Sequence, residues 1–251
     1  MEAALVAAGR GHDVTLYEKT GVLGGQLKHV DNVSFKWPLR DFKDYLVRSI
    51  KKSNVKVFLK TEITPETLSK KDYDVVLAAV GAEPVVPPIP GVDGSNVEFA
   101  IDIYGNEESL KDAVVIIGGG EVGVETGMHL AEKGHKVVLL EMRNKLAPEA
   151  APLHYYSMFM EACDRQKNLS YILNARCTEI GKDKVIYADA DGHLHEVKAG
   201  SVVIAAGMKP RIDLAMSFSG VGNIFRIIGD CNQVGDVQKA MRSAYSAASI
   251  I

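Results

Sequence analysis

Hydrophobic residues in this chain follow two patterns, which predict strands and helices. Continuous apolar runs bounded by polar residues or glycine are typical of buried parallel strands. Apolar residues spaced three or four positions apart predict amphipathic helices. The expected strands cover 55–59, 73–80, 114–117, 137–140, 169–173, 184–188, 194–197, 201–207 and 224–230, and the expected helices cover 42–52, 125–133, 240–251 and part of 148–166. Strands that alternate with helices in this way predict an α/β fold.

Residues 114–141 contain the most informative pattern, in which an apolar run leads through a glycine turn into a helix and a second apolar run. Gly118, Gly120 and Gly123 have the spacing G-x-G-x-x-G. In a dinucleotide site these glycines permit a tight turn, close approach of a pyrophosphate and close packing of helix on strand. The free N–H groups and the positive end of the helix expected at 125–133 would face the phosphates. The alternative is a glycine-rich turn in an ordinary α/β domain.

Glu141 ends the second apolar run, 23 residues after Gly118. A carboxylate at this distance can accept hydrogen bonds from the adenosine ribose hydroxyls. It would also repel the 2′-phosphate of NADP(H), so NAD(H) is the expected nucleotide. Arg143, two residues further on, leaves NADP(H) open as an alternative.

Composition excludes several other classes of protein. The chain has 251 residues, 47% of them hydrophobic, and a formal charge of −3. The near-neutral balance, without a dense Lys/Arg run, argues against binding to nucleic acid or an anionic membrane. No apolar run approaches the roughly 20 residues that span a bilayer. The cysteines Cys163, Cys177 and Cys231 are too widely spaced for a disulfide framework, so a cytoplasmic location is expected.

Trp37 and the histidine pair His193 and His195 are interpreted as structural and not as ligand-binding residues. Trp37 is interpreted as a packing anchor and not as a flavin contact. His193 and His195 follow an expected hairpin turn at Asp191-Gly192 and could face one side of a strand. Because no third ligand is evident nearby, we interpret the histidines as a solvated face and assign no metal site.

The start of the chain repeats part of the glycine-turn unit. When residues 1–18 are placed over 124–141 without gaps, Gly11 falls on Gly134 and Glu18 falls on Glu141. In this register the counterpart of Gly123 would precede Met1. We therefore expect a second dinucleotide-binding unit whose first strand and glycine turn are missing, in a truncated form of a longer protein. The alternative is a natural N-terminal helix with a chance match.

A second repeat supports two related units. Residues 201–207 repeat the pattern of 75–81, and proline-rich residues 84–91 form a stiff connector where the chain is expected to cross between domains. We predict two Rossmann-like units of the disulfide-reductase type, with the NAD unit inserted in the FAD unit. The FAD-type domain would comprise 1–103 and 220–251, and the NAD(P)-binding domain 104–219. Two adenine dinucleotides in one chain indicate hydride transfer from a nicotinamide to a flavin.

These segments resemble the nucleotide-binding half of the flavin oxidoreductases that join an old-yellow-enzyme-like barrel to a disulfide-reductase-like module. That family includes 2-enoate reductases, 2,4-dienoyl-CoA reductase and trimethylamine dehydrogenase. The resemblance covers essentially the whole chain. It rests on DVTLYEKTGVLGGQL, DVVLAAVGAEPVVPPIPG, VVIIGGGEVGVETGMHLAEKGHKVVLLE, SVVIAAGMKP and IIGDC.

The resemblance implies a role for each motif. The residues assigned to FAD are Glu18, Gly24, Gly25, Gln26, Ala79, Gly81 and Asp230, and those assigned to the nicotinamide nucleotide are Gly118, Gly120, Glu121, Gly123 and Glu141. Gly207 and Gly229 are further cofactor-binding candidates. No side chain is assigned as a catalytic acid or base, because positioning of the two rings would be the catalysis. FMN and a 4Fe-4S cluster are expected only in the missing N-terminal barrel half, which would be the partner of this half. FAD affinity is expected to be weak without the first glycine turn.

The sequence therefore predicts the electron-input module of an NAD(P)H-dependent flavin oxidoreductase that reduces an enoate- or enoyl-type substrate, and that is inactive alone. One alternative is a thioredoxin-reductase-like flavoprotein, although the chain lacks a Cys-x-x-C pair. Another is a non-catalytic module that binds ADP. Homo-oligomer formation stays open.

Overall fold

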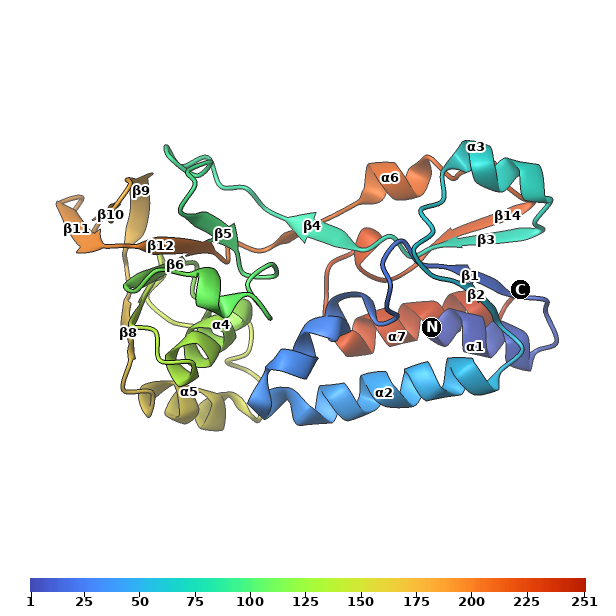
Figure 1. Cartoon of the computed structure of the whole chain (residues 1–251), viewed down its shortest axis with the longest axis horizontal. Coiled ribbons are helices and arrows are strands. Elements are labelled where there is room, and N and C mark those ends of the chain that lie inside the picture. Colours follow the sequence, from blue (N-terminus) through green and yellow to red (C-terminus); the bar gives the residue numbers. More distant parts are fainter. The chain divides into compact units, whose positions relative to one another are not determined.

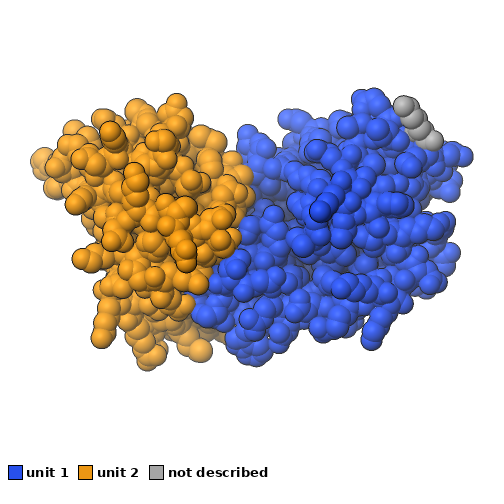
Figure 2. All heavy atoms as spheres, viewed as in Figure 1, with its two compact units in different colours: residues 1–83, 208–251 blue, residues 84–207 orange. Residues whose placement is uncertain are grey.

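The chain forms two compact α/β units in a computed structural model that describes residues 1–69 and 71–251. Unit 1 comprises residues 1–83 and 208–251, and unit 2 comprises residues 84–207 (Figure 2). Unit 2 is therefore inserted into unit 1, and the chain crosses between them twice. The predicted α/β fold with parallel strands is confirmed.

Unit 2 is built on a five-stranded sheet with the order β5-β12-β6-β7-β8, in which every neighbouring pair is parallel. Its strands are β5 (Val97–Phe99), β6 (Val114–Ile117), β7 (Val137–Leu140), β8 (Leu169–Ile172) and β12 (Ser201–Ile204). Its helices are α4 (Glu121–Glu132) and α5 (Tyr156–Asp164). Both helices pack against the sheet (Figure 1).

Strand β6 is continuously apolar because it is buried on both faces. Val114 and Ile116 belong to a core cluster that also contains residues of α4 and α5. Val115 and Ile117 belong to a second cluster, which contains residues of the three-stranded sheet described below. Successive side chains of a strand point to opposite faces. Both faces of β6 are therefore buried. Because neither face is open to solvent, every residue of the strand is apolar.

A three-stranded antiparallel sheet with the order β11-β10-β9 completes unit 2. Its strands are β9 (Arg176–Ile180), β10 (Lys184–Ala188) and β11 (Leu194–Lys198). Val185 and Ile180 contribute buried side chains to the second core cluster. The predicted hairpin at Asp191-Gly192 is confirmed, with Gly192 at φ +84°.

Unit 1 contains three two-stranded sheets, β1-β2, β14-β3 and β13-β4, among its described residues. The strands are β1 (Thr15–Tyr17), β2 (Lys56–Phe58), β3 (Val75–Ala78), β4 (Ala82–Pro84), β13 (Met208–Pro210) and β14 (Ile224–Ile227), and the helices are α1 (Glu2–Gly9), α2 (Trp37–Lys52), α3 (Pro65–Leu68), α6 (Ile212–Met216) and α7 (Val237–Ala248). Helices α1, α2 and α7 lie on one side of the strands, and α3 and α6 lie on the other (Figure 1). Small residues such as Ala3, Ala7, Ala244 and Ala248 form the cluster between α1 and α7.

Short 3₁₀ segments connect these elements, with η1 (Gly25–Asn32), η2 (Ser34–Lys36), η3 (Ser69–Lys71) and η5 (Gly229–Cys231) in unit 1 and η4 (Glu107–Ser109) in unit 2.

The segments that match in sequence have the same local structure. In unit 2 the end of α4 leads through Gly134, at φ +96°, into β7. In unit 1 the end of α1 leads through Gly11, also at φ +96°, into β1. The N–H groups of Gly134 and Gly11 donate to carbonyls three residues earlier, at 3.0 Å in both cases. The register proposed from the sequence thus places equivalent turns on each other.

The unit boundaries differ from the predicted domain boundaries at 103/104 and 219/220. Strand β5 pairs with β12, which places the residues around 97–99 in unit 2. Strand β13 pairs with β4, and Ala215 of α6 packs with Ala78 and Cys231, which places 208–219 in unit 1. The chain therefore enters unit 2 at the start of the proline-rich connector.

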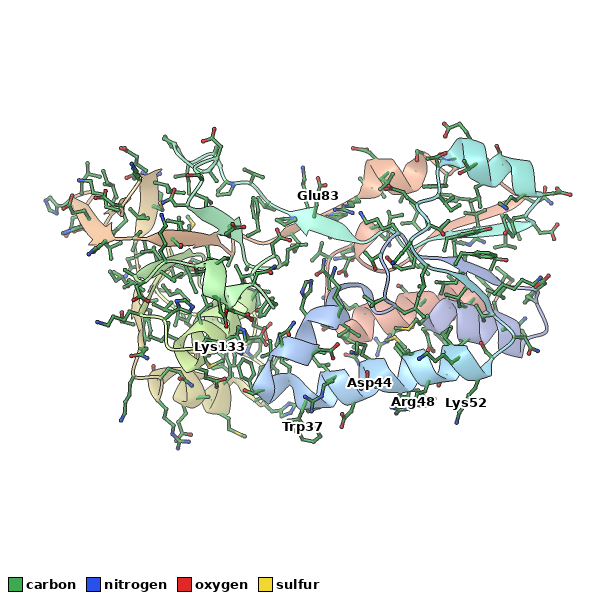
Figure 3. All side chains as sticks on the ribbon, viewed as in Figure 1. Trp37, Asp44, Arg48, Lys52, Glu83 and Lys133 are labelled. Carbon is green, nitrogen blue, oxygen red and sulfur yellow. The ribbon has the colours of Figure 1, made fainter. Side chains whose placement is uncertain are left out.

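Trp37 is not a packing anchor, because 57% of its surface is exposed. It is the first residue of α2, ahead of Pro38, and Figure 3 shows Asp44, Arg48 and Lys52 further along the same helix. Helix α2 begins five residues earlier than predicted because proline is compatible with the first turn of a helix, where no internal N–H bond is lost. Helix α4 also begins earlier than predicted, directly after Gly120.

A buried hydrogen bond between His129 and Glu107 joins α4 to η4 within unit 2. Nε2 of His129 lies 2.6 Å from Oε1 of Glu107, and the Gly105 N–H donates to the same oxygen at 2.9 Å. Burial alone would raise the pKa of Glu107. The hydrogen bonds from Gly105 and His129 outweigh burial, so that the pKa lies below its ordinary value of 4.5.

This lowered pKa predicts a pH-dependent stability. Because the folded pKa of Glu107 lies below the unfolded one, its stabilising contribution is present above pH 4.5 and is lost as the pH falls through the folded value. Glu107→Gln is expected to lower the free energy of unfolding at pH 7 by about 1–3 kcal/mol and to flatten its decline between about pH 5 and 3. Chemical denaturation of this variant and of the exposed Glu108→Gln control tests this, and an unchanged slope in Glu107→Gln would contradict it.

Candidate functional site

The turn from β6 into α4 can be made only with glycine at two positions. Gly118 has φ +111°, and a Cβ atom there would lie 2.5 Å from the carbonyl oxygen of Ala205. A Cβ atom on Gly123 would lie 1.8 Å from the carbonyl oxygen of Gly118. Real Cβ atoms do not approach backbone oxygens this closely. The first turn of α4 is therefore packed directly against the end of β6.

Gly120, unlike Gly118 and Gly123, has open space at the position that a Cβ atom would take. It is the N-cap of α4 with φ −67°, and no atom lies within 4 Å of the position that a Cβ would take. The first N–H groups of an α-helix have no partner within the helix, and the helix dipole adds partial positive charge at this end. An open face beside such N–H groups is a suitable site for a phosphate or another anion.

Glu141 is tied to this turn by its own carboxylate. Its Oε2 accepts a hydrogen bond from the Gly119 N–H at 2.6 Å, and its Oε1 accepts from the backbone N–H of Arg143 at 2.8 Å and from Nε of Arg143 at 3.0 Å. The residue is 3% exposed. Both oxygens thus already serve the protein. Oε1 already accepts two hydrogen bonds and Oε2 accepts one, which leaves a lone pair on Oε2. The assignment of Glu141 to the ribose stays a prediction.

Residues 141–150 form a loop that is fixed to the glycine turn. The Ala147 N–H donates to the Gly119 carbonyl at 2.7 Å, and a Cβ on Gly119 would lie 2.6 Å from a methyl carbon of Leu146. Gly119 lies outside the predicted set of site residues, although three consecutive glycines at 118–120 mark it in the sequence. The loop and the turn therefore position each other.

An arginine with two carboxylate partners lies on this loop. Nη1 of Arg143 lies 2.6 Å from Oε1 of Glu149, while Nε of Arg143 bonds to Glu141. The hydrogen bonds that Arg143 donates to Glu149 and Glu141 raise its pKa, and Arg143 in turn lowers the pKa of Glu149. Sequence analysis named Arg143 but did not identify Glu149, because no motif spacing marks that position.

The remaining predicted residues of unit 2 lie at the same edge of the sheet. Glu121 is the first residue of α4, and its carboxylate accepts a short hydrogen bond from the Tyr155 hydroxyl. Gly207 follows β12, whose Ile204 pairs with Ile117 of β6. The structure therefore brings Gly118, Gly120, Glu121, Gly123, Glu141 and Gly207 to the carboxyl ends of adjacent strands, where ligands bind in open α/β sheets.

In unit 1 the predicted residues form two groups. Ala79 and Gly81 follow β3, and Gly229 and Asp230 follow β14. Ala78 pairs with Ile227 in a parallel register, so these four residues lie at one sheet edge. Burial raises the pKa of Asp230, whose Oδ1 accepts from the Gly235 N–H at 3.2 Å.

The second group in unit 1 follows β1. Glu18 accepts a hydrogen bond from the Thr20 N–H at 2.7 Å, and Gly24, Gly25 and Gln26 begin the η1 segment. No hydrogen bond or ion pair within residues 1–69 and 71–251 joins Glu18 to Asp230.

A buried lysine that sequence analysis overlooked supports the glycine pair of this group. The side chain of Lys43 lies 3.4 Å from the Cβ position of Gly24, and its Nζ lies 2.5 Å from a carboxylate oxygen of Asp31. Lys43 thus fixes η1 to α2.

The hairpin near His193 corrects one interpretation. Ligand atoms of Asp189, Asp191 and His193 lie within 4.8 Å of one another, and Nε2 of His195 lies 2.7 Å from Asp189. The expectation that no third ligand lies near the histidines was therefore wrong. The turn folds Asp189 back, where it accepts from the N–H groups of Asp191 and His193 at 3.0 Å. Hydrogen bonding to His195 lowers the pKa of Asp189 to about 2, and we assign no ion to this exposed group.

In the part of the chain that the structure describes, no helix is both long enough and apolar enough to span a bilayer.

Comparison with known proteins gives a consistent family. Residues 1–247 match the family described as pyridine nucleotide-disulphide oxidoreductase. The NADH oxidase of Thermoanaerobacter brockii is 34% identical over 253 residues, covering 99% of this chain and 39% of the relative. The cinnamate reductase of Clostridium sporogenes is 32% identical, covering 100% of this chain and 37% of the relative. A structure of 2-naphthoyl-CoA reductase with 2-naphthoyl-CoA matches with TM-score 0.94 and 29% identity, covering 100% of this chain and 38% of that one.

These matches confirm the resemblance drawn from the sequence. The chain spans only about two fifths of the length of these relatives, with 39% of the first covered.

The packing of the glycine turn predicts how alanine substitutions change the free energy of unfolding. Gly123→Ala is expected to lower the free energy of unfolding of unit 2 by at least about 2 kcal/mol, because its methyl group cannot fit against the Gly118 carbonyl. Gly120→Ala has an allowed φ and open space, so a change below about 1 kcal/mol is expected. Denaturant titration of both variants provides the comparison. Equal losses in the two variants would show that the turn is not packed as described.

Proposed function

The chain belongs to the pyridine nucleotide-disulphide oxidoreductase family, and we propose that it is the electron-input part of an NAD(P)H-dependent flavin oxidoreductase. In this proposal unit 2 binds NADH and unit 1 contributes to a site for FAD. The hydride of the nicotinamide reduces the flavin. The electrons would then pass to an FMN and iron–sulfur part of a longer protein.

The observation that carries the proposal is the glycine turn of unit 2. Gly118 and Gly123 are crowded against protein atoms, whereas Gly120 has open space at the start of α4. The turn thus combines N–H donors, partial positive charge and open space at one point. A diphosphate matches this site because it is negatively charged, accepts hydrogen bonds and can approach the backbone closely.

NADH is favoured over NADPH in this proposal because of the charges beside the turn. Glu141 ends β7, and Glu149 lies on the loop that is fixed to Gly119. With Arg143 between them, these groups carry a net charge of about −1. A 2′-phosphate placed near Glu141 would be repelled, whereas ribose hydroxyls would not.

In unit 1 the proposed FAD contacts come from residues at strand ends. Ala79, Gly81, Gly229 and Asp230 share one sheet edge, and Glu18 with Gly24–Gln26 follows β1. Residues at the carboxyl ends of parallel strands are the usual ligand contacts in open α/β sheets, which supports this assignment.

The residues of this chain would act by binding and orientation. Unit 2 holds the diphosphate, and the sheet edges place the ring-bearing ends of the nucleotides. No side chain needs to donate or accept a proton in the hydride step, because positioning supplies the rate enhancement.

The relatives suggest a class of final electron acceptor. One is named as a reductase of cinnamate and another as a reductase of 2-naphthoyl-CoA. We therefore propose that the longer protein reduces an unsaturated acid or its CoA thioester, and that the part carrying the substrate lies outside these 251 residues.

Nucleotide binding by the chain itself is the direct test. NADH is expected to bind wild-type protein, and Gly120→Ala is expected to weaken it by at least about tenfold, because the added methyl group occupies the path of the diphosphate. Isothermal titration calorimetry with NADH, NADPH and ADP measures this. Lys133→Ala, at the other end of α4 and labelled in Figure 3, is the matched control and is expected to bind normally.

Three outcomes separate the alternatives. Binding of NADH that Gly120→Ala abolishes supports the proposal. Tight ADP binding without a response to NADH favours a non-catalytic nucleotide-binding module. Absence of binding by every nucleotide contradicts the proposal, as does failure of an N-terminally extended, FAD-loaded form to pass electrons from NADH to a dye.

A further inference from the structure

We propose that Glu149 is a specificity-determining residue that excludes the 2′-phosphate of NADP(H) by holding the guanidinium of Arg143, an assignment that rests on the proposed binding of NADH by unit 2. The sequence motif identifies only Glu141 as a carboxylate that would repel the 2′-phosphate. The structure adds a second carboxylate, which comes from a position eight residues further along the chain.

The position of Arg143 places a cation beside the proposed adenosine site. Its Nε lies 3.0 Å from Oε1 of Glu141, and the other oxygen of the same carboxylate accepts from Gly119 of the glycine turn. The Glu141 carboxylate therefore bridges the guanidinium and the glycine turn. An arginine at this position can bind a phosphate through a bidentate hydrogen bond.

Glu149 engages one of the Arg143 nitrogens that such a bond could use. Its Oε1 lies 2.6 Å from Nη1, while Glu141 engages Nε. The two carboxylates thus take nitrogens on two branches of the guanidinium. Two of the five N–H groups of Arg143 are thus engaged, and a 2′-phosphate would compete with a carboxylate for Nε or Nη1.

Charge balance adds to this competition. Glu141, Arg143 and Glu149 together carry about −1, so a phosphate dianion meets repulsion. Removing the charge of Glu149 makes the group neutral and leaves Nη1 without its carboxylate. Because the side chains of Arg143 and Glu149 are 43% and 62% exposed, the pair itself adds little to stability. Its loss should therefore change ligand preference and leave folding intact.

The test compares the ratio of the dissociation constants for NADPH and NADH. Glu149→Gln is expected to lower this ratio by about tenfold, and Glu149→Lys by more, since a nearby charge acts strongly on a dianion at low salt. The ratio should return toward the wild-type value as salt rises from about 20 mM to 500 mM, where screening is strong. Calorimetry on the 251-residue chain gives both constants.

Glu196→Gln is the matched control. Glu196 pairs with Lys184 at 2.6 Å, the same distance as in the Arg143–Glu149 pair, and the two side chains are 67% and 46% exposed. This pair belongs to the antiparallel sheet and not to the glycine-turn loop. The control removes the same charge from the same unit and is expected to leave the ratio unchanged.

A double variant shows whether Glu149 acts through Arg143. Adding Arg143→Gln to Glu149→Gln is expected to abolish the gain in NADPH binding. An unchanged ratio in Glu149→Gln, with NADH still bound, would overturn the inference and leave the proposed function standing. Failure of the wild-type chain to bind either nucleotide would overturn both.

Discussion

The close approach of helix α4 to the end of strand β6 is the constraint on which the rest of unit 2 depends. Gly123 faces the Gly118 carbonyl so closely that any side chain would collide, and Gly118 itself faces the Ala205 carbonyl. The start of α4 is thereby fixed at the carboxyl edge of the sheet. Its free N–H groups and its partial charge must point to the same place.

The polar groups around the turn follow from this arrangement. The Gly119 N–H is left beside the end of β7, where Glu141 accepts it, and the Gly119 carbonyl accepts the N–H of Ala147. The loop that carries Arg143 and Glu149 is thereby fixed near the turn. One packing constraint thus places the anion-binding face, the acidic residue and the arginine pair in a single neighbourhood.

Sequence patterns predicted β6, β7, β8, β10 and β11 to within one residue, but they did not predict β5 or β9. Strands β6 and β12 were found because they are buried on both faces and are therefore continuously apolar. Sequence patterns also gave the glycine turn, because its spacing reflects local sterics. They could not give the Arg143–Glu149 pair or the Lys43–Asp31 pair. Such contacts depend on how loops fold over the sheet, and no periodicity encodes them. Strand β5 was missed for a different reason, because a three-residue strand carries too little pattern.

The most direct test of the central claim is a titration with ADP-ribose followed by backbone amide NMR. The account predicts that the largest shifts fall on Gly119, Gly120, Glu121 and Val122, and that the Glu141–Glu149 loop shifts with them. Shifts concentrated elsewhere, with the amides of the glycine turn unmoved, would contradict the assignment of this turn as the diphosphate site.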